Sequence, residues 1–423
     1  MSLTTSPPSP VKSSQQLVHN IPIEEELLPD YQFQHFYPVK LGQVLDGAYE
    51  VVVKIGYGSS STVWLAKDTR CQQPTRFVAL KICTNDHADG DSASHELNIS
   101  NHIASANPSH PGWGFVRTIL DSFELKGPHG THLCLVYEPL REPLWLLQTR
   151  YVGDRFSPDL LKLILRYILY GLDYLHSECH VIHTDLKPDN ILVGLESLSV
   201  LEQVARDEVE EPSPHKDLED RTIYLPRNDF GDPESGPGKP VLTDFDIAVS
   251  GDVSHPLLHL IQPDSYRAPE VVLGAPWSYS ADIWNVGIMV NYGPSSAKNA
   301  FILTLRQMWD LLEGRSLCDQ EDPEYGRHTD RTHLSQLIGL LGPPPKVLLD
   351  QGEYSPKWFN SEGTFKFSEL IPTGISLADR VTVMDGNDKR LFLDFAGRML
   401  QWLPENRGTA KELLADPWLH SFL

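Results

Sequence analysis

The string VIHTDLKPDNILV, residues 181–193, constrains this chain more than any other feature. A short apolar segment leads into a group of polar side chains, and a second apolar segment follows. The polar side chains are His183, Asp185, Lys187 and Asn190. An aspartate can accept or orient a hydroxyl proton, a lysine can stabilise charge on a moving phosphoryl group, and an asparagine offers an oxygen to a hard cation. A polar loop between two buried segments is the alternative interpretation, and the completeness of the set argues against it.

Two glycines interrupt strand-like runs in IGYGSSSTVWLAKD, residues 55–68. Glycine lets a backbone approach a polyphosphate closely and adopt conformations closed to other residues. Gly56 and Gly58 are therefore candidates for a loop that covers phosphates. A plain hairpin turn is the commoner interpretation of a lone Gly-x-Gly.

The string VALK, residues 78–81, is an alternating strand. Alternation places Ala79 and Lys81 on one face of the strand. Ala79 leaves room for a flat ligand, and Lys81 can reach phosphate oxygens from the same face. A lysine on an edge strand is the alternative.

Two carboxylates bracket an aromatic residue in LTDFDIAVS, residues 242–250. Asp244 and Asp246 fit a metal site at the end of a buried strand. They also fit a polar turn where a strand leaves the core. These residues alone do not decide between the two.

The hydrophobic period changes once along the chain. Residues 49–137 contain short alternating or β-branched runs, whereas PDLLKLILRYILYGLDYLH, from residue 158, has apolar residues at helical spacing. The sequence predicts an α+β fold with a small β-rich lobe, 31–138, and a large α-rich lobe, 139–423. Residues 1–30 are expected to be a disordered tail, and the acidic, Pro- and Gly-rich stretch 196–240 a mobile surface insertion in the large lobe.

Composition narrows the function classes. The net charge of −22 over 423 residues argues against direct nucleic-acid binding and is compatible with a basic partner, or with solubility alone. No apolar run is long enough to span a bilayer, and the N-terminal stretch has no apolar core of a secretory signal. Five cysteines without metal-ligand spacing indicate a reduced, intracellular protein, which we expect to be a monomer in the cytoplasm, the nucleus or both.

The order of motifs resembles that of eukaryotic protein kinases. HTDLKPDN is similar to the kinase catalytic loop H-R-D-x-x-x-x-N, and DFD stands where kinases have DFG. SYRAPE (265–270), DIW (282–284) and the Arg407 segment PENRGTAKELL follow in family order, so the resemblance covers about residues 37–423. It implies the two-lobed kinase fold and the use of ATP and Mg²⁺.

Thr184 stands where most kinases have arginine, and HTD resembles the SR-protein kinases, serine/threonine kinases of Arg/Ser-rich proteins. The entry segment from Tyr37, GTHLCLVYEPL and HLSQLIGLLGPPPKVLLDQGEYSPKWFNSEGTFK are similar to that family as well. The resemblance implies a basic, Arg/Ser-rich protein substrate and no membrane partner. Without the arginine that grips an activation-loop phosphate, we predict activity that does not require activation-loop phosphorylation.

The resemblance also implies a role for each matching residue. Asp185 would be the catalytic base, Lys187 would contact the γ-phosphate, and Asn190 and Asp244 would bind the metal. Ile55, Gly56, Gly58, Val63 and Ala79 would surround ATP, and Lys81 would hold its phosphates while pairing with Glu96. Glu138 and Leu140 would supply backbone contacts to adenine, and Glu270 would pair with Arg407.

Two departures from the family pattern bear on activity. Asp246 replaces the glycine of the metal motif and adds a carboxylate. Residues 291–308 interrupt a helix whose flanks, SADIWNVGIMV and WDLLEGRSL, rejoin in register, so a retained intron is one hypothesis for this stretch. The alternative function is a catalytically weak, kinase-like scaffold that binds nucleotide or basic partners. A small-molecule phosphotransferase fits less well, because SYRAPE resembles a protein-substrate platform.

Overall fold

The computed structural model describes residues 15–71, 75–85, 92–233, 236, 238–288, 311–312 and 320–421. Its contacts form two compact units. The sheet unit comprises Met1–Asn98, Thr118–Glu142 and Leu195–Gly238, and the helical unit comprises Ile99–Arg117, Pro143–Gly194 and Lys239–Leu423. A smaller β-rich unit and a larger helix-rich unit are the architecture that the change of hydrophobic period predicts.

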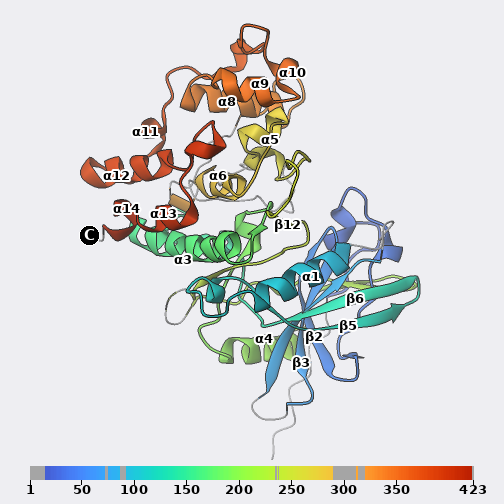
Figure 1. Cartoon of the computed structure of the whole chain (residues 1–423). Coiled ribbons are helices and arrows are strands. Elements are labelled where there is room, and N and C mark those ends of the chain that lie inside the picture. The colour runs from blue at the N-terminus through green and yellow to red at the C-terminus, as the bar shows by residue number, and fades with distance from the viewer. Residues whose placement is uncertain are drawn as a thin grey trace, which may run out of the picture. The chain divides into compact units, whose positions relative to one another are not determined.

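An antiparallel six-stranded sheet forms the framework of the sheet unit, in the order β1-β2-β3-β4-β6-β5 (Figure 1). Its strands are β1 (Val44–Leu45), β2 (Tyr49–Gly58), β3 (Ser61–Asp68), β4 (Arg76–Cys83), β5 (Ile119–Gly127) and β6 (Gly130–Tyr137). Helix α1 (Ser92–Ser105) follows β4, and the boundary between the two units falls inside it. Gly58 pairs with Ser61 at the end of the β2–β3 hairpin, so the predicted phosphate-covering loop is the tip of this hairpin.

The strand register places the predicted nucleotide residues on one face of this sheet. Val63 lies opposite Lys81, and Leu65 lies opposite Ala79. Because side chains alternate along a strand, these four share a face. Gly56 pairs with Val63 and extends the same row into β2.

The acidic stretch is an ordered part of the sheet unit. It contains α4 (Ser199–Glu210) and a hairpin of β9 (His215–Asp217) and β10 (Thr222–Tyr224). Leu201, Val204 and Ala205 of α4 pack against side chains of the sheet: Val53, Leu65 and Phe77. The sequence-based division placed 196–240 in the large lobe as a mobile insertion, whereas the contacts group Leu195–Gly238 with the sheet. The apolar side of α4 is the physical reason, since it needs a surface to cover it.

The N-terminal segment also packs on the sheet unit where the structure describes it. Gln16 forms a parallel bridge with His215 of β9, and Glu24–Leu27 forms a 3₁₀ turn, η1. Glu25 forms a buried ion pair with Lys54 of β2, and Glu26 pairs with Lys216 of β9. A disordered tail was expected over 1–30, but its described part, residues 15–30, packs on the sheet unit; residues 1–14 lie outside the described residues.

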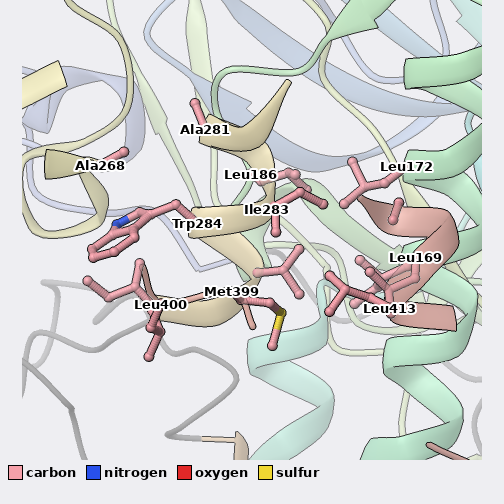
Figure 2. Close-up of a cluster of buried hydrophobic side chains, with 14 of the residues drawn as sticks. Leu169, Leu172, Leu186, Ala268, Ala281, Ile283, Trp284, Met399, Leu400 and Leu413 are labelled. Carbon is pink, nitrogen blue, oxygen red and sulfur yellow. The ribbon is translucent and has the colours of Figure 1, made fainter. Parts of the chain in front are cut away.

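Helices α3 (Pro158–Ser177) and α6 (Ser280–Ile288) form the core of the helical unit. Ser157 caps α3 by accepting a hydrogen bond from the Leu160 amide, and Pro158 occupies the first turn, where its missing N–H costs nothing. Figure 2 shows apolar side chains of α3 and α6 meeting Met399, Leu400 and Leu413. A Cβ at Gly287 would lie 2.8 Å from Cβ of Met399, so this close approach requires glycine.

The remaining elements of the helical unit surround this core. They are α2 (Leu144–Gln148), β7 (Val181–Ile182), β8 (Ile191–Val193), β11 (Pro240–Leu242), β12 (Val249–Ser250), α5 (Pro269–Leu273), α8 (Asp330–Leu341), α9 (Lys346–Gln351), α10 (Ser355–Trp358), α11 (Leu377–Arg380), α12 (Gly386–Gly397), α13 (Ala410–Leu414) and α14 (Pro417–His420). The insert predicted over 291–308 lies outside the described residues. None of the helices in the described ranges is long and apolar enough to cross a bilayer.

Candidate active site

The loop between β7 and β8 is held in shape by its own polar side chains. Asn190 Nδ2 donates hydrogen bonds to the carbonyl and to Oδ2 of Asp185, both at 2.9 Å. Lys187 Nζ donates to the same Oδ2 at 2.6 Å. Two of the residues predicted from the 181–193 string, Lys187 and Asn190, therefore converge on the carboxylate of a third, Asp185. Both bonds are made to Oδ2, so within this loop Oδ1 of Asp185 is the oxygen left to receive a substrate hydroxyl.

His183 connects this loop to the strand that precedes the two carboxylates of LTDFDIAVS. Its Nδ1 accepts from the Asp185 amide at 3.3 Å, so the proton lies on Nε2, which donates to the Thr243 carbonyl at 3.0 Å. Thr243 in turn donates its amide to the Asn190 carbonyl at 2.9 Å. These bonds fix β11 beside β8, with which it pairs.

Asp282, at the beginning of α6, anchors the loop backbone. Its carboxylate is fully buried and accepts hydrogen bonds from the amides of His183, at 2.8 Å, and Thr184, at 2.9 Å. His176 of α3 contacts the same carboxylate at 2.8 Å. The motif DIW marked this residue in the sequence, but the role of Asp282 was not predicted, because its partners lie 98 and 99 residues away along the chain.

Asp244 lies two residues after the end of β11, with Thr243 between them. Its backbone φ is 70°, in the left-handed region that a non-glycine residue adopts only at a cost. Thr184 of the catalytic loop has a φ of 66°. Asp246, in contrast, does not have a positive φ, so its position does not need the conformational freedom of glycine.

The carboxylates of this loop shift the pKa of their neighbours. Burial alone would lower the pKa of Lys187, but Asp185, Asp189 and Asp244 outweigh it and the net shift is upward. Burial raises the pKa of Asp189 to about 6, although Lys187 opposes the change. Oδ2 of Asp189 is buried and has no hydrogen-bond partner. Lys187 is therefore a cation that can meet a transferring anionic group.

In the sheet unit, Lys81 and Glu96 form the predicted ion pair. Lys81 Nζ lies 2.8 Å from Oε1 and from Oε2 of Glu96, and both side chains are buried. Tyr137 donates its hydroxyl to Glu96 at 3.3 Å. The strand β4 and the helix α1 thus hold a buried lysine at a fixed position, on the face that also carries Val63 and Ala79.

The hairpin tip of the same unit is open. Neither Gly56 nor Gly58 has a positive φ, and a Cβ on Gly58 would meet no atom within 4 Å. The glycines here leave space on the sheet face instead of supplying an unusual backbone. Glu138 follows β6 and pairs through its exposed side chain with Arg76, at 3.0 Å, and Leu140 is half-buried.

Comparisons with known proteins agree with this geometry. The family model described as "Protein kinase domain" matches residues 49–419. A serine/threonine protein kinase of Aspergillus fumigatus is 38% identical over 417 residues, which are 98% of this chain and 95% of the relative. The "Serine/threonine-protein kinase SRPK" of Physarum polycephalum is 30% identical, over 94% of this chain and 91% of the relative.

The chain belongs to the serine/threonine protein kinases. Its similarity to "SRSF protein kinase 3" of Sus scrofa reaches 38% over 191 residues, 44% of this chain and 33% of the relative. A crystal structure of a kinase domain superimposes with a TM-score of 0.64 at 23% identity, covering 91% of this chain and 99% of that one, which shows the two-lobed kinase fold.

The kinase also contains the structural bridge that the resemblance implies. Arg407 donates to both carboxylate oxygens of Glu270, at 2.7 and 2.6 Å, and the two side chains are fully buried. Arg407 further donates to the Ser280 carbonyl at 3.0 Å, next to the start of α6. This bidentate geometry ties the SYRAPE segment to the C-terminal part of the helical unit.

The donor set of the kinase suits a hard divalent cation that is shared with a nucleotide. Among the described residues, no three His, Cys, Asp or Glu side chains cluster closely enough to hold a metal by themselves. The Nδ2 of Asn190 is bound to Asp185, so its amide oxygen is the atom left to ligate a metal. Mg²⁺ is usually held by one or two protein oxygens together with substrate phosphates, which Asn190 and Asp244 fit.

Proposed function

We propose that this kinase transfers the γ-phosphoryl group of Mg²⁺-bound ATP to serine in basic, Arg/Ser-rich proteins. The observation that carries the proposal is the convergence of Lys187 and Asn190 on the carboxylate of Asp185. In the proposed reaction, Asp185 orients the substrate hydroxyl and accepts its proton. Lys187, protonated because of its carboxylate neighbours, stabilises the transferring group.

The remaining residues position the nucleotide in the proposed mechanism. Lys81, fixed by Glu96, would hold the phosphates, and Ile55, Val63 and Ala79 would line the apolar part of the site. Asn190 and Asp244 would hold Mg²⁺, which supplies electrostatic stabilisation of the phosphates when it is bound. Backbone groups at Glu138 and Leu140 would contact adenine.

Charge supports the proposed substrate class. The chain has a net charge of −22, and Asp189 and Asp246 add carboxylates beside the proposed catalytic and metal-binding residues. An excess of negative charge attracts basic peptides and raises their rate of encounter. The names of two relatives, SRPK and SRSF protein kinase 3, point to the same substrate class.

The direct test is transfer of labelled phosphate to an Arg/Ser-repeat peptide, in parallel with a serine peptide without arginine, in which lysine replaces arginine and every serine is kept. We expect transfer to the first peptide only, and an Asp185→Asn variant should be at least 10³-fold slower, since general-base and positioning effects together contribute that much. Equal transfer to a serine peptide without arginine would contradict the proposed substrate class. Nucleotide binding without any transfer would contradict the proposed reaction.

We further propose that the activation loop needs no phosphate. Thr184 stands in place of the arginine that would bind a phosphate on this loop. Its hydroxyl already donates a hydrogen bond to the Ile247 carbonyl. Protein made in bacteria and treated with phosphatase should keep full activity. Complete dependence on prior treatment with another kinase would refute this expectation.

A further inference from the structure

Thr184 is the residue of the catalytic loop whose type differs most from the family pattern, and the structure gives it two contacts. Its amide donates to Oδ1 of Asp282 at 2.9 Å. Its hydroxyl donates to the Ile247 carbonyl at 2.8 Å. Thr184 is fully buried, so bulk water does not compete for its hydroxyl, whereas Ile247 at the other end of the bond is partly exposed.

The second contact falls in the middle of the segment that carries Asp244. At its N-terminal end this segment is held by Thr243, which bonds to Asn190 and His183. At its C-terminal end, Val249 and Ser250 pair with β7. Between these ends the chain turns, with the Ala248 amide donating to the Phe245 carbonyl at 3.3 Å. Thr184 reaches this turn three residues after Asp244.

Thr184 and Asp244, which lies three residues before the other end of the Thr184 contact, both have a costly backbone conformation. Thr184 has a φ of 66°, which is unusual for a β-branched residue, and Asp244 has a φ of 70°. Such conformations persist only where surrounding bonds determine them. Two hydrogen bonds of Thr184 are of this kind. One runs from its backbone amide to the Asp282 carboxylate, and the other from its hydroxyl to the Ile247 carbonyl.

We propose that Thr184 is a positioning residue for phosphoryl transfer. Its hydroxyl fixes the turn after Asp244 to the catalytic loop, so an uncharged hydrogen bond sets the position of Asp244 relative to Asp185. Because the contact carries no charge, it needs neither a phosphate nor a particular protonation state. The inference rests on the protein kinase activity of the chain and is independent of the proposed Arg/Ser-rich substrate.

The test compares Thr184→Val, which keeps the shape and loses the donor, with Thr184→Ser, which keeps the donor. Thr332→Val is the matched control, since Thr332 is also fully buried and donates its hydroxyl to a carbonyl, that of Thr329 at the N-cap of α8, at 2.9 Å. Activity is measured with myelin basic protein, a generic basic acceptor, after phosphatase treatment. Thr184→Ala is a second variant that relieves the strain of β-branching, should the valine variant fold poorly.

We expect Thr184→Val to lower kcat about tenfold, the equivalent of one neutral hydrogen bond at ~1.4 kcal/mol, with KM for the acceptor changed less than about twofold. Thr184→Ser should stay near the parent value. In the absence of nucleotide and metal, hydrogen–deuterium exchange of the peptide 243–250 should rise in Thr184→Val and Thr184→Ala, but not in Thr332→Val.

Three results would overturn the proposal. The first is a kcat of Thr184→Val no lower than that of Thr332→Val per folded molecule. The second is a serine variant as slow as the valine variant. The third is unchanged exchange over 243–250. A change in exchange does not depend on any substrate, so failure of the proposed Arg/Ser specificity would leave this result standing.

Discussion

Glu24, in the turn η1, is a buried carboxyl group that lacks a complete set of partners. It has a φ of 53°, and its Oε2 has no hydrogen-bond partner. Burial raises its pKa from 4.5 to about 7, against the attraction of Lys54 and with repulsion from Glu25. The ionisable neighbours of Glu24 are Lys54, Glu25 and Tyr57. The pKa of Tyr57 is itself raised to about 12, mainly by burial and further by Glu24 and Glu25.

The sign of the stability effect follows from this upward shift. Between about pH 4.5 and 7 the folded chain keeps a proton on Glu24 that the unfolded chain releases, so stability falls as the pH rises through this window. Glu24→Gln removes the effect. We expect the variant to match the parent near pH 4 and to exceed it by up to ~3 kcal/mol at pH 8, measured by urea unfolding. Glu202→Gln on the exposed side of α4 is the control, and parallel pH profiles for parent and Glu24→Gln would contradict the prediction.

The Arg407–Glu270 pair is a second residue-scale case, because both side chains are fully buried. Arg407→Met leaves the Glu270 carboxylate without its partner, and removing one member of a buried pair costs ~3–5 kcal/mol. The double variant Arg407→Met, Glu270→Gln carries no such charge and should recover part of the loss. Thermal unfolding of the three proteins measures this, and a double variant less stable than the single one would show that the explanation is wrong.

At the scale of single residues, the sequence predicts which side chains take part in the reaction better than it predicts which distant residues hydrogen-bond to them. Asp185, Lys187 and Asn190 lie within six positions, and their mutual bonds follow from one short loop. Asp282 bonds to the same loop from 98 residues away, and no local pattern encodes that contact. The bond from Thr184 to Ile247 was missed for the same reason.

At the scale of elements, α4 is where the sequence-based expectation and the structure differ most. Acidic residues with Pro and Gly indicated a mobile insertion, yet Leu201, Val204 and Ala205 recur at helical spacing and form the side that packs on the sheet. That spacing was visible in the sequence. The surface it covers was not, because Val53 and Leu65 precede Leu201 by 148 and 136 residues along the chain.

Leu201→Ala tests whether α4 stabilises the sheet unit. Leu201 is fully buried, so its truncation should cost ~2–5 kcal/mol and lower the unfolding temperature of the sheet unit by several degrees. Val209→Ala is the matched control, since Val209 lies on the same helix and is 65% exposed. If α4 only covered the surface loosely, the two variants would unfold at the same temperature.

At the scale of the whole molecule, the two-lobed architecture follows from the sequence because strand and helix periods occupy separate parts of the chain. The extent of the sheet unit does not follow from the sequence, because this unit also includes Leu195–Gly238, which comes after the catalytic loop along the chain. The segment that the sequence marks as an interruption of the core helix, 291–308, lies outside the described residues. Parts of its two flanks are described, and these parts are buried: α6 from Ala281 to Ile288, and Leu311 with Leu312.

Deleting residues 291–308 would restore one helical stripe across these flanks. After the deletion, Leu311 stands seven positions after Val286, and Leu312 stands seven positions after Gly287. Seven positions are about two helical turns, so each leucine lies on the same side of the helix as the residue it follows. The shortened kinase should fold and unfold at a higher temperature than the full chain, because it no longer closes an 18-residue interruption inside a helix. Deleting only 291–307 is the control, since one extra residue rotates both leucines by about 100° away from that side. Equal stability of the two deletions, or a loss of stability on removing 291–308, would mean that the flanks do not belong to one helix.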